Sequence, residues 1–145
     1  MVELTHPLPD GTPVDDRWRL VLDLDRLVPC VEGGRVTEKT APDSVKAEIR
    51  VKMGAMSMTF VGTVAVVEQD ESSHRALLRV KSREKGGQGH ANADVTFALD
   101  GDGGTISTRA QITGKAASMG EGVVSSVLDA LIKDFVAKFA AAAAA

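Results

Sequence analysis

Side chains that could perform chemistry are few in this sequence, and their spacing matches no familiar site. The three histidines, His6, His74 and His90, lie far apart and form neither an H-x-H nor an H-E-x-x-H zinc motif. Cys30 is the only cysteine, which excludes an internal disulfide and a multi-cysteine metal site and suits a reducing compartment. We expect the histidines at the surface and Cys30 buried as a small hydrophobe.

The other candidates for catalysis also lack activating neighbours. The glycine runs G-G-Q-G and G-D-G-G have neither the lysine nor the following helix of a phosphate-binding loop. No nucleophile elbow surrounds the serines Ser57, Ser118, Ser125 and Ser126. The inward positions of the strands described below carry almost no ionisable residue, and general acid–base catalysis needs a titratable group at the substrate. The sequence therefore argues against an enzyme.

Three methionines within six positions, Met53, Met56 and Met58, are the sharpest signal. Methionine is flexible and fills irregular space, so these side chains either complete the core or border a cavity that adapts to a guest. A cavity is favoured because the chain has no tyrosine, one tryptophan and four phenylalanines. Small residues at inward strand positions also leave volume unfilled, namely Ala47, Gly62, Ala76, Ala91, Ala93 and Ala110.

Composition limits the class of protein. A chain of 145 residues that is 43% hydrophobic and 26% charged is typical of one soluble globular domain. A net charge of −3 and the lack of a basic stripe with interleaved aromatics argue against nucleic acid as a partner. No signal peptide and no membrane-spanning run is visible. We expect a cytoplasmic protein with one domain over residues 1–140 and a low-complexity alanine tail over 141–145.

The beginning of the chain predicts a strand and two short helices. Residues 2–8 form the strand. Thr12 is expected to cap a helix that holds Pro13 in its first turn and Trp18 on its apolar face. A second short helix is broken near Pro29 and ends at a pair of glycines.

From residue 35 to residue 113 the apolar pattern has a period of two, which predicts antiparallel strands with one wet face. The apolar positions are odd before Gly54-Ala55 and even after it. A two-residue type II′ turn there explains the change and pairs Met53 with Met56. Glycine loops separate the later runs, about 75–81, 91–99 and 106–112, and residues 35–40 could add one strand before the hairpin.

A long helix is predicted from about Lys115 to the end of the chain. Its apolar stripe consists of Val124, Leu128, Leu131, Phe135 and Phe139. This stripe is the only large apolar surface available to a one-sided sheet, so the sheet should curl around it. The predicted class is α+β, with a curved antiparallel sheet wrapped around a long C-terminal helix and two short helices after the first strand.

Four stretches carry a family resemblance: VDDRWRLVLDLDRLVPCVEG, VKMGAMSMTFVGTV, GGTIST and ITGKAASMGEGVVSSVLDALIKDFVAKF. In this order they resemble the carbon monoxide dehydrogenase CoxG family of the START/Bet v 1-like superfamily, whose members have the helix-grip fold. Residues that match the family pattern are Trp18, Asp23, Gly54, Phe60, Gly62, Gly104, Thr105, Gly114, Lys115, Ala117 and Gly120. Where the family usually has Pro-Gly after the second helix, this chain has Glu32-Gly33, so the lid there should differ in shape.

The resemblance implies an accessory protein of molybdenum-containing CO dehydrogenase, peripheral to the inner face of the cytoplasmic membrane. The C-terminal extension through which members often associate with the membrane is expected to be shortened or absent here. An enzyme that feeds electrons to the respiratory chain suggests a quinone, namely menaquinone, as the hydrophobic guest, with no covalent cofactor. The expected ligand-binding residues are Val51, Met53, Met56, Met58, Phe60, Leu78, Val80, Val95, Phe97, Ile112, Met119, Val124, Leu128 and Leu131.

Two other interpretations stay open at this point. One is a docking module with a filled core that recruits the dehydrogenase to the membrane without a ligand. The other is an enzyme of the polyketide-cyclase kind, which would need inward polar groups, and the best available are Ser82, Asn92 and Thr108.

Overall fold

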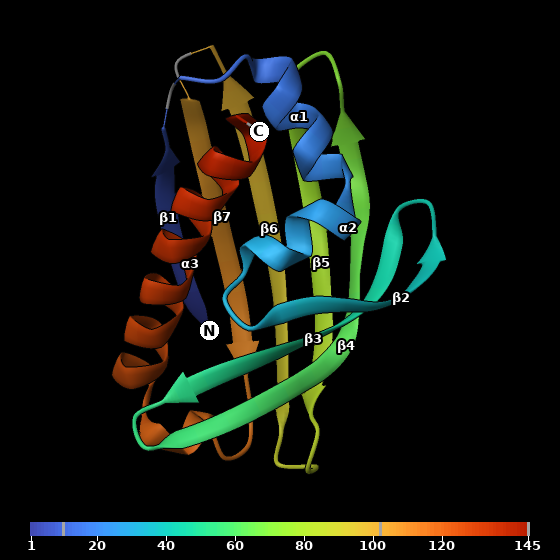
Figure 1. Ribbon diagram of the computed structural model, residues 1–145. Coiled ribbons are helices and arrows are strands. Elements are labelled where there is room, and N and C mark those ends of the chain that lie inside the picture. Colours follow the sequence, from blue (N-terminus) through green and yellow to red (C-terminus); the bar gives the residue numbers. More distant parts are fainter. Residues whose placement is uncertain (10, 102, 145) are drawn as a thin grey trace.

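One curved antiparallel sheet forms the framework of the protein (Figure 1). The computed structural model describes residues 1–9, 11–101 and 103–144. The strands within them are β1 (Val2–Leu8), β2 (Gly34–Ala41), β3 (Ser44–Met53), β4 (Met56–Asp70), β5 (Arg75–Glu84), β6 (His90–Asp100) and β7 (Gly103–Ile112). Their order is β1-β7-β6-β5-β4-β3-β2, so β2 to β7 form a meander and β1 pairs with β7 at one edge.

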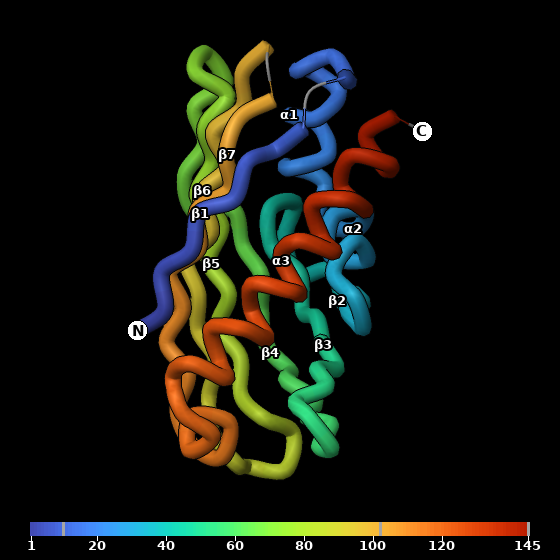
Figure 2. The backbone as a smooth tube through the Cα atoms, turned by 90° about the vertical axis from the view of Figure 1, so that its left-hand side faces the viewer, coloured from blue at the N-terminus to red at the C-terminus, as the bar shows by residue number. Residues whose placement is uncertain are grey.

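The helices lie inside the curve of this sheet. After β1 come α1 (Val14–Leu22), α2 (Leu24–Leu27) and the 3-10 turn η1 (Val28–Cys30), and after β7 come the 3-10 turn η2 (Ala117–Met119) and α3 (Glu121–Ala144). Figure 2 shows the sheet bending until β2 and β3 lie on the opposite side of α3 from β1 and β7. The predicted α+β architecture, a curved sheet wrapped around the C-terminal helix, is confirmed.

The hairpin between β3 and β4 has the register that the change of parity predicted. Met53 lies opposite Met56, and Ala47 lies opposite Gly62. Gly54 has a φ of 64°, while Ala55 does not take a positive φ, as a type II′ turn requires. Because the register is correct, every even-numbered apolar residue of β4 from Met56 onward faces the concave side.

Two helix starts differ from the sequence prediction. Pro13 is the N-cap of α1 and no side chain caps it, so the prediction of Thr12 as the cap is wrong. The backbone carbonyl of Thr12 instead accepts a hydrogen bond from a buried arginine, Arg17, at 3.0 Å. The long helix begins at Glu121 rather than near Lys115, because Gly120 takes a φ of 97° that ends the preceding 3-10 turn and cannot continue a helix.

α3 buries one face against the sheet and α1. Its buried residues are Val124, Ile132, Phe135, Phe139 and Ala143. Leu128 and Leu131, which belong to the predicted stripe, are only half-buried. The helix continues through Ala144, and the proposed division of the chain at residue 140 stays a prediction. Among the described residues, no helix is both long and apolar enough to cross a bilayer.

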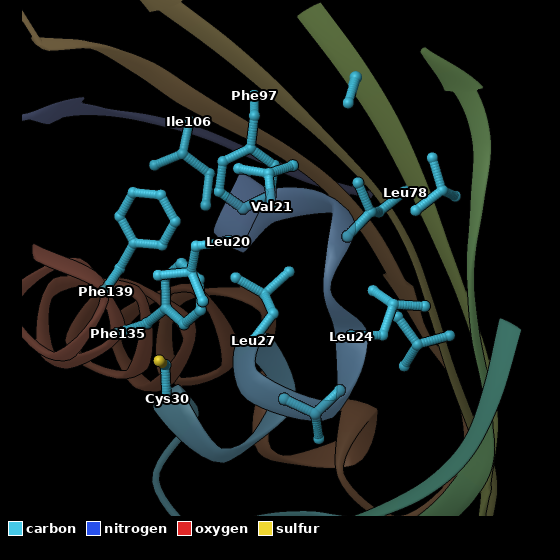
Figure 3. Close-up of a cluster of buried hydrophobic side chains, with 14 of the residues drawn as sticks. Leu20, Val21, Leu24, Leu27, Cys30, Leu78, Phe97, Ile106, Phe135 and Phe139 are labelled. Atoms are coloured by element: carbon cyan, nitrogen blue, oxygen red, sulfur yellow. The ribbon is translucent and has the colours of Figure 1, made fainter. Parts of the chain in front are cut away.

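Aromatic rings fill one end of the interior (Figure 3). Phe97 of β6 meets Phe135 and Phe139 of α3, with ring centroids 6.1 Å and 5.8 Å away. Leu20 and Val21 of α1 are fully buried in the same cluster. Aromatic contacts of this kind add stability beyond the area they bury, so this end of the protein is packed solid by its own side chains.

Arg17 connects α1 to the turn between β6 and β7. The residue is 2% exposed, and its guanidinium donates to the backbone carbonyls of Thr12, Gly103 and Asp100. A buried cation is tolerated only where hydrogen bonds replace its hydration, and these carbonyls supply them. The sequence analysis missed this contact because a cation between Asp16 and Trp18 looks like an ordinary surface residue of a helix.

We expect the substitution Arg17→Met to lower the free energy of unfolding by about 2–4 kcal/mol, because it leaves buried carbonyls without donors. Urea denaturation followed by circular dichroism measures this change. The matched control is Arg19→Met, whose side chain is 70% exposed and pairs only with Asp16, so it should change stability by less than about 0.5 kcal/mol. Equal effects of both substitutions would contradict the structural role of Arg17.

Gly62 allows β4 and β5 to approach each other closely. A Cβ at this position would lie 1.9 Å from the backbone oxygen of Lys81 and 2.6 Å from Cα of Ser82. Gly62→Ala should therefore push the strands apart and lower the free energy of unfolding by about 1–3 kcal/mol in a denaturant titration. At Gly122 an added Cβ meets nothing within 4 Å, so Gly122→Ala should leave stability unchanged or slightly raise it.

Candidate functional site

A cavity of about 230 Å³ lies between the sheet and α3, and it is partly open to solvent. β3 to β7 contribute its floor, while residues of α2, η1 and α3 cover it. Its half-buried members include Ile49 and Val51 on β3 and Val127 and Leu131 on α3. The opening therefore lies between α3 and β3, which diverge toward the start of the helix in Figure 2.

The surface of the cavity is almost entirely carbon. A sealed apolar void of this volume would cost on the order of 5 kcal/mol if it stayed empty, by the scale measured for cavities in protein cores. Water gains little there, because it needs two to four polar partners and the walls offer few. The cavity is therefore suited to a guest that is mainly hydrophobic.

Most of the predicted ligand-binding residues lie in the wall of this cavity. Those found there are Val51, Met53, Phe60, Leu78, Val80, Val95, Phe97, Ile112, Val124, Leu128 and Leu131. Met56, Met58 and Met119 are not part of the wall. Whether any of these side chains contacts a ligand stays a prediction.

The methionines mainly close one end of the interior. Met53 and Met58 are buried in a second hydrophobic cluster with Val2, Phe60, Ala116 and Val124, and Met56 and Met119 pack against it. Figure 1 shows the tip of the β3–β4 hairpin beside the η2 segment, where this cluster forms. Of the three hairpin methionines, only Met53 belongs to both the cluster and the cavity wall, so the other two act as core residues.

The sequence analysis missed one wall of the cavity. Leu27, Val28 and Val31, in and after the second short helix, line it. Leu27 and Val28 are buried, and Leu27 points into the interior in Figure 3. The signal was present in the apolar run L-V-P-C-V, but a helix of 4 residues is too short for its periodicity to identify the inward face.

Small residues create the free volume, as the sequence predicted. Ala93 of β6 lies directly opposite Ala110 of β7, and Ala91 lies opposite Ile112. All of them line the cavity. Two adjacent strands that place alanine face to face leave a depression that larger side chains would fill.

Three polar residues, Ser82, Asn92 and Thr108, also line the cavity. Ser82 Oγ donates to the carbonyl of Ala91 at 2.5 Å, and Asn92 Oδ1 accepts from the backbone N–H of Ser82 at 3.2 Å. The hydroxyl of Thr108 is buried and has no hydrogen-bond partner. A buried hydroxyl left without a partner costs about 1–3 kcal/mol, which makes Thr108 an unusual feature of an apolar wall.

His6 is not a surface residue, so that prediction is wrong. It is 6% exposed, and its Nε2 lies 2.7 Å from Oδ1 of Asp129 on α3. Hydrogen bonds from Lys133 and from His6 lower the pKa of Asp129, so the side chain stays a carboxylate and accepts a hydrogen bond from the imidazole ring. The contact joins β1 to α3 across 123 residues of sequence, a separation that single-sequence patterns do not reveal.

The other candidate reactive groups are ordinary structural residues. His74 packs edge-on to Trp18 with ring centroids 5.5 Å apart, and His90 is exposed at the start of β6. Cys30 is buried as predicted, and burial raises the pKa of its thiol. No group of three or more histidine, cysteine, aspartate or glutamate side chains that could hold a metal occurs among the described residues.

Comparison with solved structures supports the fold. A conserved protein from Geobacillus kaustophilus aligns with a TM-score of 0.78 and 22% identity over 98% of this chain and 92% of that one. A STAR-related lipid transfer protein from Xanthomonas axonopodis aligns with a TM-score of 0.65 and 14% identity over 94% and 84%. The Zhui aromatase/cyclase from a Streptomyces species aligns with a TM-score of 0.57 and 15% identity over 98% and 92%.

These identities are low, so the solved structures establish the START/Bet v 1-like fold and nothing more specific. No curated protein sequence matches the chain. The family model of carbon monoxide dehydrogenase CoxG matches residues 11–144, which is nearly the whole chain and includes every element that surrounds the cavity except β1. The chain belongs to the carbon monoxide dehydrogenase CoxG family.

Proposed function

We propose that this protein is an accessory protein of molybdenum CO dehydrogenase that holds a respiratory quinone, menaquinone, in its apolar cavity and links the enzyme to the cytoplasmic membrane. The observation that carries the proposal is the carbon-lined cavity beneath α3. Family membership supports the partner, because the family takes its name from that enzyme.

The size and the opening of the cavity fit a ligand with a compact ring and a long tail. A volume of about 230 Å³ suits a bicyclic ring system, and it is too small for a complete isoprenoid tail. The opening between β3 and α3 lets such a tail leave over Val51, Val127 and Leu131. A tail that protrudes there would bring the protein to a bilayer surface, into which the tail can partition.

A quinone also fits the electron flow around the partner. Oxidation of CO releases electrons that an aerobic cell passes to its respiratory chain, and quinones are the mobile carriers in the membrane. A protein that shields the apolar ring from water could move it between the bilayer and the enzyme. The proposed role is thus binding and transfer of the carrier, while the redox chemistry occurs in the dehydrogenase and the membrane.

The two alternative functions receive less support. A docking module with a filled core does not account for an open apolar cavity under the main helix. A cyclase would need acid–base groups at the substrate, whereas the wall residues that the structure describes include no carboxylate, imidazole or amine side chain. Structural likeness to an aromatase/cyclase reflects the shared fold.

Extraction of the freshly purified protein with organic solvent should release a quinone that mass spectrometry identifies as menaquinone. The protein must be produced in cells that synthesise menaquinone, and a protein of similar size purified in parallel is the control for carry-over of lipid. Repeated preparations that contain no quinone above this control, together with no uptake of added menaquinone, would reject the proposal.

Filling the cavity should block the ligand and leave the fold intact. Ala93→Leu places a larger side chain in the depression opposite Ala110, so it should lower the amount of bound quinone at least about tenfold. Ala98→Leu is the matched control, because Ala98 lies on the same strand but faces the other side of the sheet. If both variants retain bound quinone, or both lose it equally, the ligand lies elsewhere.

A further inference from the structure

Thr108 is the one polar residue of the cavity wall whose side chain has unused hydrogen-bonding capacity. It is 6% exposed, and its hydroxyl has no partner, whereas the hydroxyl of Ser82 and the amide oxygen of Asn92 are both engaged. Its position on β7, between Ile106 and Ala110, directs the side chain into the cavity, as for both of these neighbours.

The hydroxyl can be turned toward the cavity without any movement of the backbone. Thr108 contributes to the wall, yet its Oγ1 is fully buried, so the carbon atoms of the side chain form the surface that faces the space. A rotation about χ1 exchanges the methyl and hydroxyl groups of threonine between staggered positions. A ligand atom that accepts a hydrogen bond would favour the rotamer that presents the hydroxyl.

The depression beside Thr108 gives a ligand room at this point. Thr108 lies opposite Val95, and the next inward pair along the same two strands is Ala93 and Ala110. A ring that occupies the alanine depression would bring an atom at its edge next to the threonine hydroxyl. The remainder of the ligand would then extend toward the opening between β3 and α3.

We propose that Thr108 anchors the polar end of the ligand by donating a hydrogen bond to an oxygen on its ring. The ligand class is then an apolar ring compound with an acceptor oxygen at its edge, such as a ring carbonyl, rather than a pure hydrocarbon or a fatty acyl chain. This inference rests on the proposed function, because it requires that the cavity holds the ligand. Thr108 is a binding residue that orients the ring, and no chemical step is assigned to it.

A matched pair of small ligands tests the anchor. 1-Tetralone and tetralin share a bicyclic skeleton and differ by one ring carbonyl, and their affinities for the full chain can be measured by calorimetric titration. Thr108→Val, which keeps the shape of the side chain, should lower the affinity for 1-tetralone about fivefold and leave that for tetralin within about twofold. The same variant without ligand should melt at an equal or higher temperature, because it removes a buried hydroxyl that has no partner.

Two further variants make the result specific. Thr108→Ser keeps the hydroxyl and should retain most of the preference for 1-tetralone. Ser82→Ala should leave both affinities unchanged, because the Ser82 hydroxyl already donates to the carbonyl of Ala91. Equal losses for the two ligands in Thr108→Val, or no loss for either, would overturn the anchor and leave cavity binding intact. Failure of the wild-type protein to bind either ligand would reject the anchor and count against the proposed function as well.

Discussion

The geometry of this protein depends on a mismatch between a broad curved sheet and the one long helix that covers it. α3 packs against β1 and the α1–η1 segment, and it leaves β3 on the far side of the interior (Figure 2). A single helix is about 10 Å wide, so it cannot fill the concave face of a seven-strand sheet. Side chains make up the difference at one end, where Phe97, Phe135 and Phe139 pack together, but alanines leave it open in the middle.

The sheet could be predicted from the sequence because its rules are local. Alternation identified the strands, and the change of parity at Gly54 fixed the turn and the register of β3 with β4. The same alternation identified which residues face inward, so the small residues around the cavity and most of its wall followed. Volume could be inferred in this way because the inward alanines of neighbouring strands must lie side by side in a meander.

Features that depend on contacts between distant segments were not accessible from the sequence. His6 meets Asp129 across 123 residues, and Arg17 donates to carbonyls more than 80 residues away, so both looked like surface residues. The start of α3 depended on a positive φ at Gly120, which residue type permits but does not require. The hairpin methionines were misleading for a related reason, because alternation gives the face of a strand but not the position along the cavity.

The division of the interior into a packed end and an open middle separates folding from binding. Arg17, the aromatic cluster and the His6–Asp129 contact join the helices to the sheet through groups that lie outside the cavity wall or at its packed end. The fold therefore does not require a ligand to hold α3 in place. A guest can enter and leave over the half-buried side chains of β3 and α3 while the packed end keeps its contacts. This arrangement suits a protein that must release its hydrophobic ligand as readily as it binds it, since the exchange breaks none of the contacts that stabilise the fold.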